Sequence, residues 1–190
     1  MTEAETRLLQ LLKERSFRRG SFRLASGAES SYYIDGKASE VFSESAYLIG
    51  QVLYERTKDL GVEGIGGLEV GSVPLAAAAV IVYHLNGRSM EGFWVRDKVK
   101  DHGTKKLVEG VVRPGSRVVV VDDVVTSGGS SVKAVEAVRA LGCEVVQVIA
   151  LVDRLQGAEE LLHTHGVRDY RPVFTIRDFG VEVDARGSAR

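Results

Sequence analysis

The sequence contains one cysteine and almost no net charge, and each of these shortages excludes a class of protein. A single cysteine, Cys143, can form neither an intrachain disulfide nor a cysteine metal cluster. Because it follows a predicted helix, we expect it to be a small core residue. The 25 basic and 26 acidic residues leave a formal net charge of −1. General nucleic-acid binders carry a basic excess, so we expect no binding to nucleic acid.

Long apolar segments are missing as well. The longest nearly apolar run, Val73–Val82, is too short to span a bilayer. The N-terminus carries Glu3 and Glu5 and lacks the order of basic and then apolar residues that is typical of a signal peptide. We therefore expect a cytoplasmic protein without membrane contact.

The remaining composition is that of a soluble globular protein, with 44% hydrophobic and 27% charged residues. A length of 190 residues suffices for one domain with a full hydrophobic core. We find no repeat, linker or low-complexity segment, so residues 1–190 are predicted to form a single domain. The tail Asp184–Arg190 is expected to be disordered.

Apolar periodicity predicts helices that alternate with strands. Helices are expected from the capping box Thr2-x-x-Glu5 to Ser16, and over Ser43–Lys58, Val73–Leu85, Val132–Leu141 and Ala158–His165. Strands are expected around Phe22–Leu24 and Tyr33–Ile34, and over Ile65–Leu68, Phe93–Arg96, Val118–Val121, Val145–Val152 and Val173–Ile176. The polar segment Asp97–Gly110 is predicted to be a long loop. This alternation indicates an α/β fold built on a parallel sheet.

The stretch Val118–Ser131 combines a buried strand, a turn of small residues and the start of a helix. The glycines of the turn Thr126–Ser130 let consecutive backbone N–H groups converge on one point. The helix adds unpaired N–H groups and the positive end of its dipole, and the hydroxyl groups of the turn can donate hydrogen bonds as well. Together these features predict a phosphate-binding cradle.

Two adjacent carboxylates, Asp122 and Asp123, stand where this strand is predicted to end. They would repel a polyphosphate but can accept hydrogen bonds from two vicinal hydroxyls. No Gly-Lys-Ser/Thr follows, which excludes a Walker loop, and the G-x-G-x-x-G dinucleotide fingerprint is absent. A sugar phosphate with two free ring hydroxyls fits both halves of the stretch.

Val118–Ser131 closely resembles the phosphoribosyl-pyrophosphate (PRPP) signature of type I phosphoribosyltransferases, and further segments resemble other motifs of this family in the same order. The segment Phe22–Asp35, FRLASGAESSYYID, is similar to the N-terminal motif of orotate phosphoribosyltransferases. This resemblance places Tyr33 and Ile34 against orotate. Some relatives have a lysine at the position of Ala25, and its contact with PRPP is missing here.

A second glycine-rich segment, Gly66–Pro74, reads GGLEVGSVP. It carries three glycines and no bulky residue between Val70 and Pro74, as a backbone that a ligand approaches closely requires. The resemblance to the family identifies this segment as the expected pyrophosphate loop. Some relatives have a lysine where Gly71 stands.

The segment Arg96–Lys106, RDKVKDHGTKK, holds five basic residues against two acidic ones. A solvated surface loop can have this composition, but a pyrophosphate leaving group also requires a cationic loop. The segment resembles the mobile catalytic loop of the family, in which Arg96, Lys100 and His102 would contact PRPP. Asp97 departs from the pattern, because the family commonly has a lysine there.

Asp153 and Arg154 follow the predicted strand Val145–Val152. A residue at the carboxyl end of such a strand faces the usual ligand crevice of an open α/β sheet, and the plain alternative is a surface ion pair between the two. In the family, an arginine at this position lies on the edge of the orotate ring. Arg154 is therefore the candidate for base recognition.

The resemblance implies the type I phosphoribosyltransferase fold, a central parallel sheet flanked by helices, with a small N-terminal hood formed by residues 1–40 and the C-terminal segment. It implies transfer of the phosphoribosyl group of PRPP to orotate, which gives orotidine 5′-monophosphate and pyrophosphate in pyrimidine synthesis. Implied catalytic residues are Lys100, His102 and Asp123, and implied orotate-binding residues are Thr126, Arg154, Tyr33 and Ile34. Implied PRPP-binding residues are Arg96, Lys100, His102, Asp122, Asp123, Val124, Val125, Thr126, Ser127, Gly128, Gly129 and Ser130.

Mg²⁺ is the expected cofactor, held through pyrophosphate, ribose hydroxyls and water without direct protein ligands, because it dehydrates reluctantly. The resemblance also implies a homodimer in which the loop Arg96–Lys106 reaches over the cradle of the partner subunit. Two alternatives stay open. A phosphoribosyltransferase for another base would lack the Phe22–Asp35 motif, and a PRPP-sensing regulator on the same fold would need no cationic loop.

Overall fold

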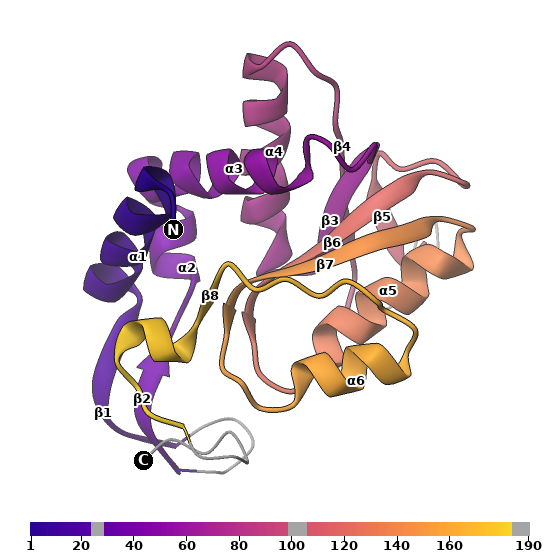
Figure 1. Ribbon diagram of the computed structural model, residues 1–190. Coiled ribbons are helices and arrows are strands. Elements are labelled where there is room, and N and C mark those ends of the chain that lie inside the picture. Colours follow the sequence, from indigo (N-terminus) through magenta and orange to yellow (C-terminus); the bar gives the residue numbers. More distant parts are fainter. Residues whose placement is uncertain (24–28, 99–105, 184–190) are drawn as a thin grey trace.

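The structure of the chain is a computed structural model that describes residues 1–23, 29–98 and 106–183. A six-stranded sheet runs through its centre with helices on both faces, and a two-stranded sheet lies beside it (Figure 1). The expected disordered tail Asp184–Arg190 and two candidate catalytic residues, Lys100 and His102, lie outside the described residues.

The helices and strands follow the predicted order. The helices are α1 (Glu3–Arg15), α2 (Lys37–Glu40), α3 (Ser43–Thr57), α4 (Ser72–Leu85), α5 (Gly129–Ala140), α6 (Ala158–Thr164) and the 3-10 helix η1 (Ile176–Phe179). The strands are β1 (Phe17–Arg23), β2 (Glu29–Ile34), β3 (Gly64–Leu68), β4 (Glu91–Val95), β5 (Val108–Gly110), β6 (Arg117–Val125), β7 (Glu144–Asp153) and β8 (Phe174–Thr175). All five predicted helices are confirmed, and Thr2 and Glu5 form the expected capping box. None of the helices in these ranges has the length and apolarity needed to cross a bilayer.

The strands of the large sheet have the order β5-β4-β3-β6-β7-β8. All neighbours from β4 to β8 pair in parallel, which confirms the predicted parallel sheet. The edge strand β5 runs antiparallel to β4. The prediction of one loop up to Gly110 is therefore wrong at its end: Val108 pairs with Val95 and packs against a hydrophobic core, so this part of the segment becomes a strand.

The valines Val118–Val121 of strand β6 contribute to two hydrophobic cores, one on each face of the sheet. Val119 and Val121 pack in the core shared with α1, α3 and α4, and Val118 and Val120 pack against α5 and α6. Successive side chains of a strand point to opposite faces, so a run of valines suits a strand that helices cover on both sides. Figure 1 shows α4 on one side of the sheet and α5 and α6 on the other.

The strand that carries the two aspartates is longer than the sequence predicts. β6 continues to Val125, because Val124 and Val125 still pair with β7. Asp122 and Asp123 therefore lie inside the strand and not after it, and their side chains start from opposite faces of the sheet.

Two other strand predictions are wrong at their ends. The first strand of the N-terminal hairpin begins at Phe17, which pairs with Ile34, and not near Phe22. The last strand stops at Thr175, because Thr175 and Asp178 form a capping box that starts the helix η1.

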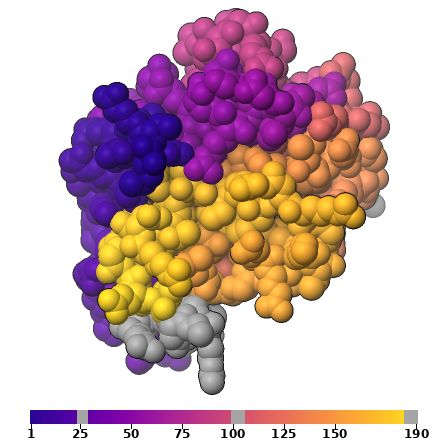
Figure 2. Space-filling model, viewed as in Figure 1, coloured from indigo at the N-terminus to yellow at the C-terminus, as the bar shows by residue number. Residues whose placement is uncertain are grey.

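The two-stranded sheet β1–β2 lies against the C-terminal segment of the chain (Figure 1). Nη2 of Arg19 donates a hydrogen bond of 2.6 Å to the backbone oxygen of Gly180, and the ring centroids of Phe17 and Phe179 are 5.4 Å apart. Figure 2 shows the C-terminal residues, in yellow, directly beside the N-terminal helix. The two ends of the described chain are thus packed together on one side of the large sheet.

Candidate active site

Four parallel strands end at the same edge of the large sheet and bring the predicted site residues to it. β3 leads into the segment 69–71, β4 into Arg96, β6 into the turn 126–128 and β7 into Arg154. These strands are direct neighbours in the order β4-β3-β6-β7, so segments far apart in the sequence meet here. Open α/β sheets bind their ligands at this edge.

The turn after β6 forms a hollow of about 300 Å³ at the start of α5. Gly128 has a φ of +86°, a left-handed conformation that favours glycine. The first N–H groups of α5 have no partner within the helix and are suited to an anion. The hollow is lined by Asp122, Val124, Val125, Thr126, Ser127, Gly128, Gly129, Ser130 and Lys133. The expected cradle residues are therefore brought together, and Lys133 joins them although the sequence did not suggest it.

The carboxyl group of Asp122 points into the protein, where only 7% of the residue is exposed. Its Oδ2 accepts a hydrogen bond of 2.8 Å from Oγ of Ser131, and its Oδ1 accepts one of 3.1 Å from the backbone N–H of Asp123. Burial raises the pKa of Asp122 to about 7, and the negative charge of Asp123 acts in the same direction. The sequence predicts equal roles for the two aspartates, but their environments differ: Asp122 connects β6 to α5.

The carboxylate of Asp123 is partly exposed and lies between two glycines. A Cβ atom at Gly71 would overlap Oδ1 of Asp123, and a Cβ atom at Gly36 would lie 3.1 Å from its Oδ2. Gly71 belongs to the predicted pyrophosphate loop. A lysine at this position would require Asp123 to move, which gives a physical reason for the glycine.

Glu40, the last residue of α2, is a buried acid that no sequence motif indicated. It is 2% exposed, and neither carboxyl oxygen has a hydrogen-bond partner among the described residues. A Cβ atom at Gly36 would overlap Oε1 of Glu40, so this carboxyl group and that of Asp123 meet at the same glycine. Burial raises the pKa of Glu40 to about 9, and the negative charge of Asp123 is the next cause.

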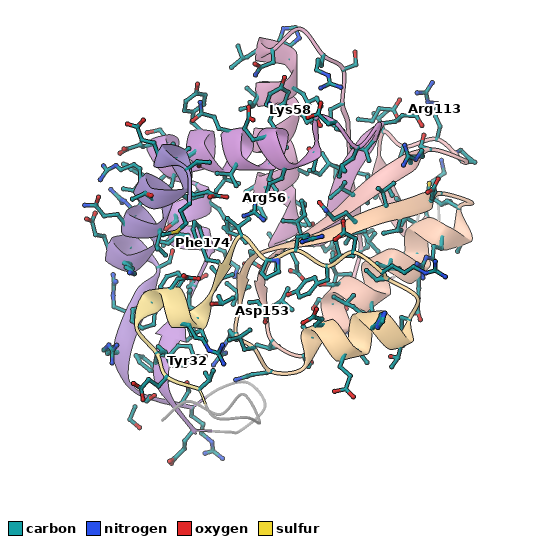
Figure 3. All side chains as sticks on the ribbon, in the orientation of Figure 1. Tyr32, Arg56, Lys58, Arg113, Asp153 and Phe174 are labelled. Carbon is teal, nitrogen blue, oxygen red and sulfur yellow. The ribbon has the colours of Figure 1, made fainter. Side chains whose placement is uncertain are left out.

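Arg154 is buried and held on one side by Tyr32 of β2. Nε of Arg154 donates a hydrogen bond of 3.0 Å to the hydroxyl of Tyr32, and the guanidinium carbon lies 4.8 Å from the centre of the tyrosine ring. Nη2 of Arg154 has no partner within the part of the chain that the structure describes. Figure 3 labels Tyr32 and Asp153, which mark the two sides of this contact, the small sheet and the end of β7. A guanidinium with an unpaired Nη2 donor suits a planar, anionic ligand.

Strand β2 presents Tyr32 to Arg154 and directs Tyr33 away from it. Tyr33 is 44% exposed and its ring lies 5.6 Å from that of Phe22, whereas Ile34 is buried in a core. Alternation along a strand puts Tyr32 and Ile34 on one face, and this alternation was the signal that could have identified Tyr32. The orotate contacts assigned to Tyr33 and Ile34 stay predictions.

Arg96 stands where β4 ends, at the base of the predicted catalytic loop. Its Nη1 lies 3.6 Å from Oε1 of Glu109, and its backbone N–H donates to the backbone oxygen of Leu107 at 2.9 Å. The next residue, Asp97, forms an ion pair of 2.9 Å with Lys133 on α5, and the hydrogen bond in this pair lowers the pKa of Asp97. The two ends of the loop are thus paired with each other and connected to the cradle helix.

The acidic groups near the cradle do not form a metal cage. Asp122 faces inward, Glu40 is buried, and Asp123 is partly exposed. In the ranges 1–23, 29–98 and 106–183, no cluster of three or more His, Cys, Asp or Glu side chains could hold a metal ion. This donor set fits a cation that arrives bound to a phosphorylated substrate.

Comparison with known proteins agrees with this arrangement. Residues 65–168 match the phosphoribosyl transferase domain family. The chain is 42% identical over 180 residues to the orotate phosphoribosyltransferase of Bradyrhizobium sp. (strain ORS 278), covering 93% of this chain and 97% of the relative. It is 44% identical over 179 residues to the enzyme of that name from Sorangium cellulosum (strain So ce56), covering 91% of each.

A solved structure extends the comparison to three dimensions. The crystal structure of Mycobacterium tuberculosis H37Rv orotate phosphoribosyltransferase in complex with PRPP covers 94% of this chain and 99% of its own, with a TM-score of 0.79 and 36% identity. Similarity of this extent in both sequence and structure shows that the chain belongs to the orotate phosphoribosyltransferase family and has the type I phosphoribosyltransferase fold.

Proposed function

We propose that the edge of the sheet formed by the cradle, Asp123 and Arg154 transfers the phosphoribosyl group of PRPP to orotate. The products are orotidine 5′-monophosphate and pyrophosphate, in the synthesis of pyrimidine nucleotides. The observation that carries the proposal is the meeting of a phosphate cradle, a carboxylate and a buried arginine with a free donor at the ends of neighbouring strands. The M. tuberculosis relative, which was solved with PRPP, supports PRPP as the donor substrate.

In the proposed complex, the cradle Thr126–Ser130 binds the 5-phosphate, and Asp123 accepts hydrogen bonds from the ribose hydroxyls. Asp122 would support this binding indirectly, because it accepts hydrogen bonds from Ser131 and from the backbone N–H of Asp123 and so holds the end of β6 in place. Ribosyl transfer passes through an oxocarbenium-like state, and the negative charge of Asp123 favours it. The reaction needs no covalent intermediate, so catalysis consists mainly of positioning and electrostatic stabilisation.

The leaving pyrophosphate requires cations. Arg96, Lys100 and His102 are the proposed source, together with Lys133, which lines the hollow. Closure of the loop Arg96–Lys106 would bring the three loop residues to the pyrophosphate and exclude water. Mg²⁺ would arrive bound to PRPP and supply further neutralisation of the pyrophosphate charge.

Orotate is recognised, in this proposal, by Arg154 and by the turn at Thr126. The unpaired Nη2 donor of Arg154 suits the planar edge of an anionic pyrimidine. Tyr33 and Ile34 are the further candidates that the resemblance names. The N-terminal residues 1–40 and the C-terminal segment would form the hood over this base site.

The enzyme is proposed to act as a homodimer in which the loop Arg96–Lys106 serves the cradle of the partner subunit. Symmetric homodimers are the commonest assemblies, and an isologous contact builds two equivalent sites.

An absorbance assay tests the proposed reaction. With PRPP and Mg²⁺ present, orotate absorbance should decline, and Asp123→Asn should slow the decline on the order of 10²-fold, typical of removing one electrostatic group. Adenine in place of orotate serves as the control base. Turnover of adenine but not of orotate would support a transferase for another base, and PRPP binding without any turnover would support the regulator.

A further inference from the structure

We propose that Glu40 is a positioning residue for Asp123: it stays protonated and donates a hydrogen bond to the Asp123 carboxylate, which then presents its remaining lone pairs to the ribose of PRPP. The inference rests on the proposed function, because that function assigns the ribose to Asp123. It gives a role to a side chain on α2, outside every motif that resembles the family.

The geometry brings the two carboxyl groups to one point. Both oxygens of Glu40 are buried and lack a hydrogen-bond partner within the described ranges. The absence of a side chain at Gly36 leaves room for both, since a Cβ atom there would overlap Oε1 of Glu40 and lie 3.1 Å from Oδ2 of Asp123. The two carboxyl groups are therefore neighbours beside the same glycine.

The charges around Glu40 favour its protonated form. Burial is the main cause of the raised pKa of Glu40. Two negative groups, Asp123 on β6 and Asp35 just before α2, raise this pKa further. Lys37 opposes them, but its Nζ is paired with Asp35 at 3.3 Å and its side chain is 61% exposed. The resulting pKa of about 9 leaves Glu40 a carboxylic acid, and thus a donor, at neutral pH.

A buried carboxylic acid without a partner costs free energy that a hydrogen bond recovers. Hydrogen bonds to an ionised carboxylate are stronger than those between neutral groups, so Asp123 is the favoured acceptor. On its other side, Asp123 packs against Gly71 of the pyrophosphate loop. Asp123 would then be fixed in orientation from both sides before PRPP binds, which is the preorganisation that catalysis by electrostatics requires.

The protonation state can be measured without substrates. An infrared difference spectrum between wild type and Glu40→Gln at pH 7 should contain the carbonyl band of a protonated carboxylic acid that only the wild type has. This band should disappear from the wild type at pH values above about 10, where Glu40 ionises. Absence of the band at pH 7 would overturn the proposal, and the result holds whichever base the enzyme accepts.

The kinetic test separates positioning from a purely structural role. If Glu40 is the donor, kcat/KM of the wild type for PRPP should decline near pH 9, where Glu40 ionises. Glu40→Gln keeps a donor for Asp123 but cannot ionise, so this decline should be absent from the variant. Glu40→Ala has no donor and should lower kcat/KM for PRPP roughly 10- to 100-fold, since small misplacements cost this much. The KM for orotate should stay unchanged.

Glu44→Gln is the matched control, because Glu44 is an exposed glutamate that pairs with Arg7 on the surface. It should behave as the wild type at all pH values. An alkaline decline that is identical in wild type and Glu40→Gln would overturn the proposal. If Glu40→Ala does not fold, the kinetics of Glu40→Gln and its infrared spectrum still test the proposal. If the proposed reaction itself is wrong, the wild type will not turn over orotate. The same variants would then be compared by their affinity for PRPP, measured by calorimetry, in place of kcat/KM.

Discussion

The hydroxyl of Tyr32 lies 3.0 Å from Nε of Arg154, so the arginine at the end of β7 is held by the N-terminal hairpin. Tyr32 is 1% exposed, and its ring also lies beneath the guanidinium group. A side chain that is already fixed loses less conformational freedom when it binds a ligand. We therefore expect the hairpin to contribute to orotate affinity through Arg154.

Tyr32→Phe tests this contribution. The substitution keeps the ring but removes the acceptor for Nε, so the KM for orotate should rise about 3- to 10-fold, the loss expected for one hydrogen bond. The KM for PRPP should hardly change. Initial rates with each substrate varied in turn measure both values, and Tyr47→Phe, on the exposed side of α3, is the control. An equal rise in both KM values would contradict the anchoring role.

Arg154→Ala should raise the KM for orotate far more than the KM for PRPP, because the proposed contact involves only the base. Arg154→Lys should show the same pattern, since lysine keeps the charge but lacks the planar fork. Thermal unfolding of both variants checks that the fold is intact. Comparable effects on the two substrates would remove Arg154 from base recognition.

Asp122 should make stability depend on pH. Its folded pKa of about 7 exceeds the ordinary value of 3.8, so between these values the folded state keeps a proton that the unfolded state has released. Stability must then fall as the pH rises from about 4 to about 7. Asp122→Asn cannot ionise and should be more stable than the wild type at pH 8, by roughly 2–4 kcal/mol.

Urea unfolding at two pH values measures this effect. The advantage of Asp122→Asn should vanish only about one pH unit below the ordinary value of 3.8, where both states of the wild type are largely protonated at this position. A difference that is independent of pH would show that packing, and not the charge of Asp122, is responsible.

Asp97→Lys should increase kcat/KM for PRPP. The substitution releases Lys133 from its ion pair of 2.9 Å and adds a second cation beside the cradle. Both partners are at least half exposed, so solvent screens the pair and the free energy of unfolding should hardly change. Asp97→Asn, which releases Lys133 without adding charge, should give a smaller gain. A fall in kcat/KM would show that the ion pair holds the loop in its working position.

Mixed dimers test whether sites are shared. Lys100→Ala and Asp123→Asn homodimers should each be nearly inactive. When the two are unfolded together and refolded, about half the dimers should be hybrids, by random pairing of subunits. In each hybrid, one shared site then contains both substitutions and the other contains neither. With one intact site in two across half the dimers, activity should recover to roughly a quarter of wild type if the sites act independently. No recovery from verified hybrids would refute the shared site.

The sequence predicted the parts of the fold and the site that depend on local pattern. The valines of β6 and the glycines of the following turn are adjacent in the chain, so the buried strand and the cradle were predictable from their own residues. The helices followed from periodicity for the same reason.

The missed contacts join residues that no local pattern connects. Tyr32 and Arg154 are far apart in the sequence and meet only because β2 is folded beside the end of β7. Glu40 lies on a helix of a single turn, which is too short to show periodicity. The strand β5 also escaped prediction, since it depends on pairing with β4 more than on its own three residues.

The order of the strands also determines when, during folding, the site can form. β6 pairs with β3 on one side and β7 on the other, and the partners Gly64 and Val118 are far apart in the chain. Such pairings form slowly, because the entropy of closing a long loop is lost before the contact stabilises the chain. A chain still emerging from the ribosome, complete only as far as α5, would hold the valine strand with one unpaired edge and a cradle without support from β7. Ligand binding is therefore acquired late, and during the same interval the apolar strand β6 has an unpaired edge, which favours aggregation.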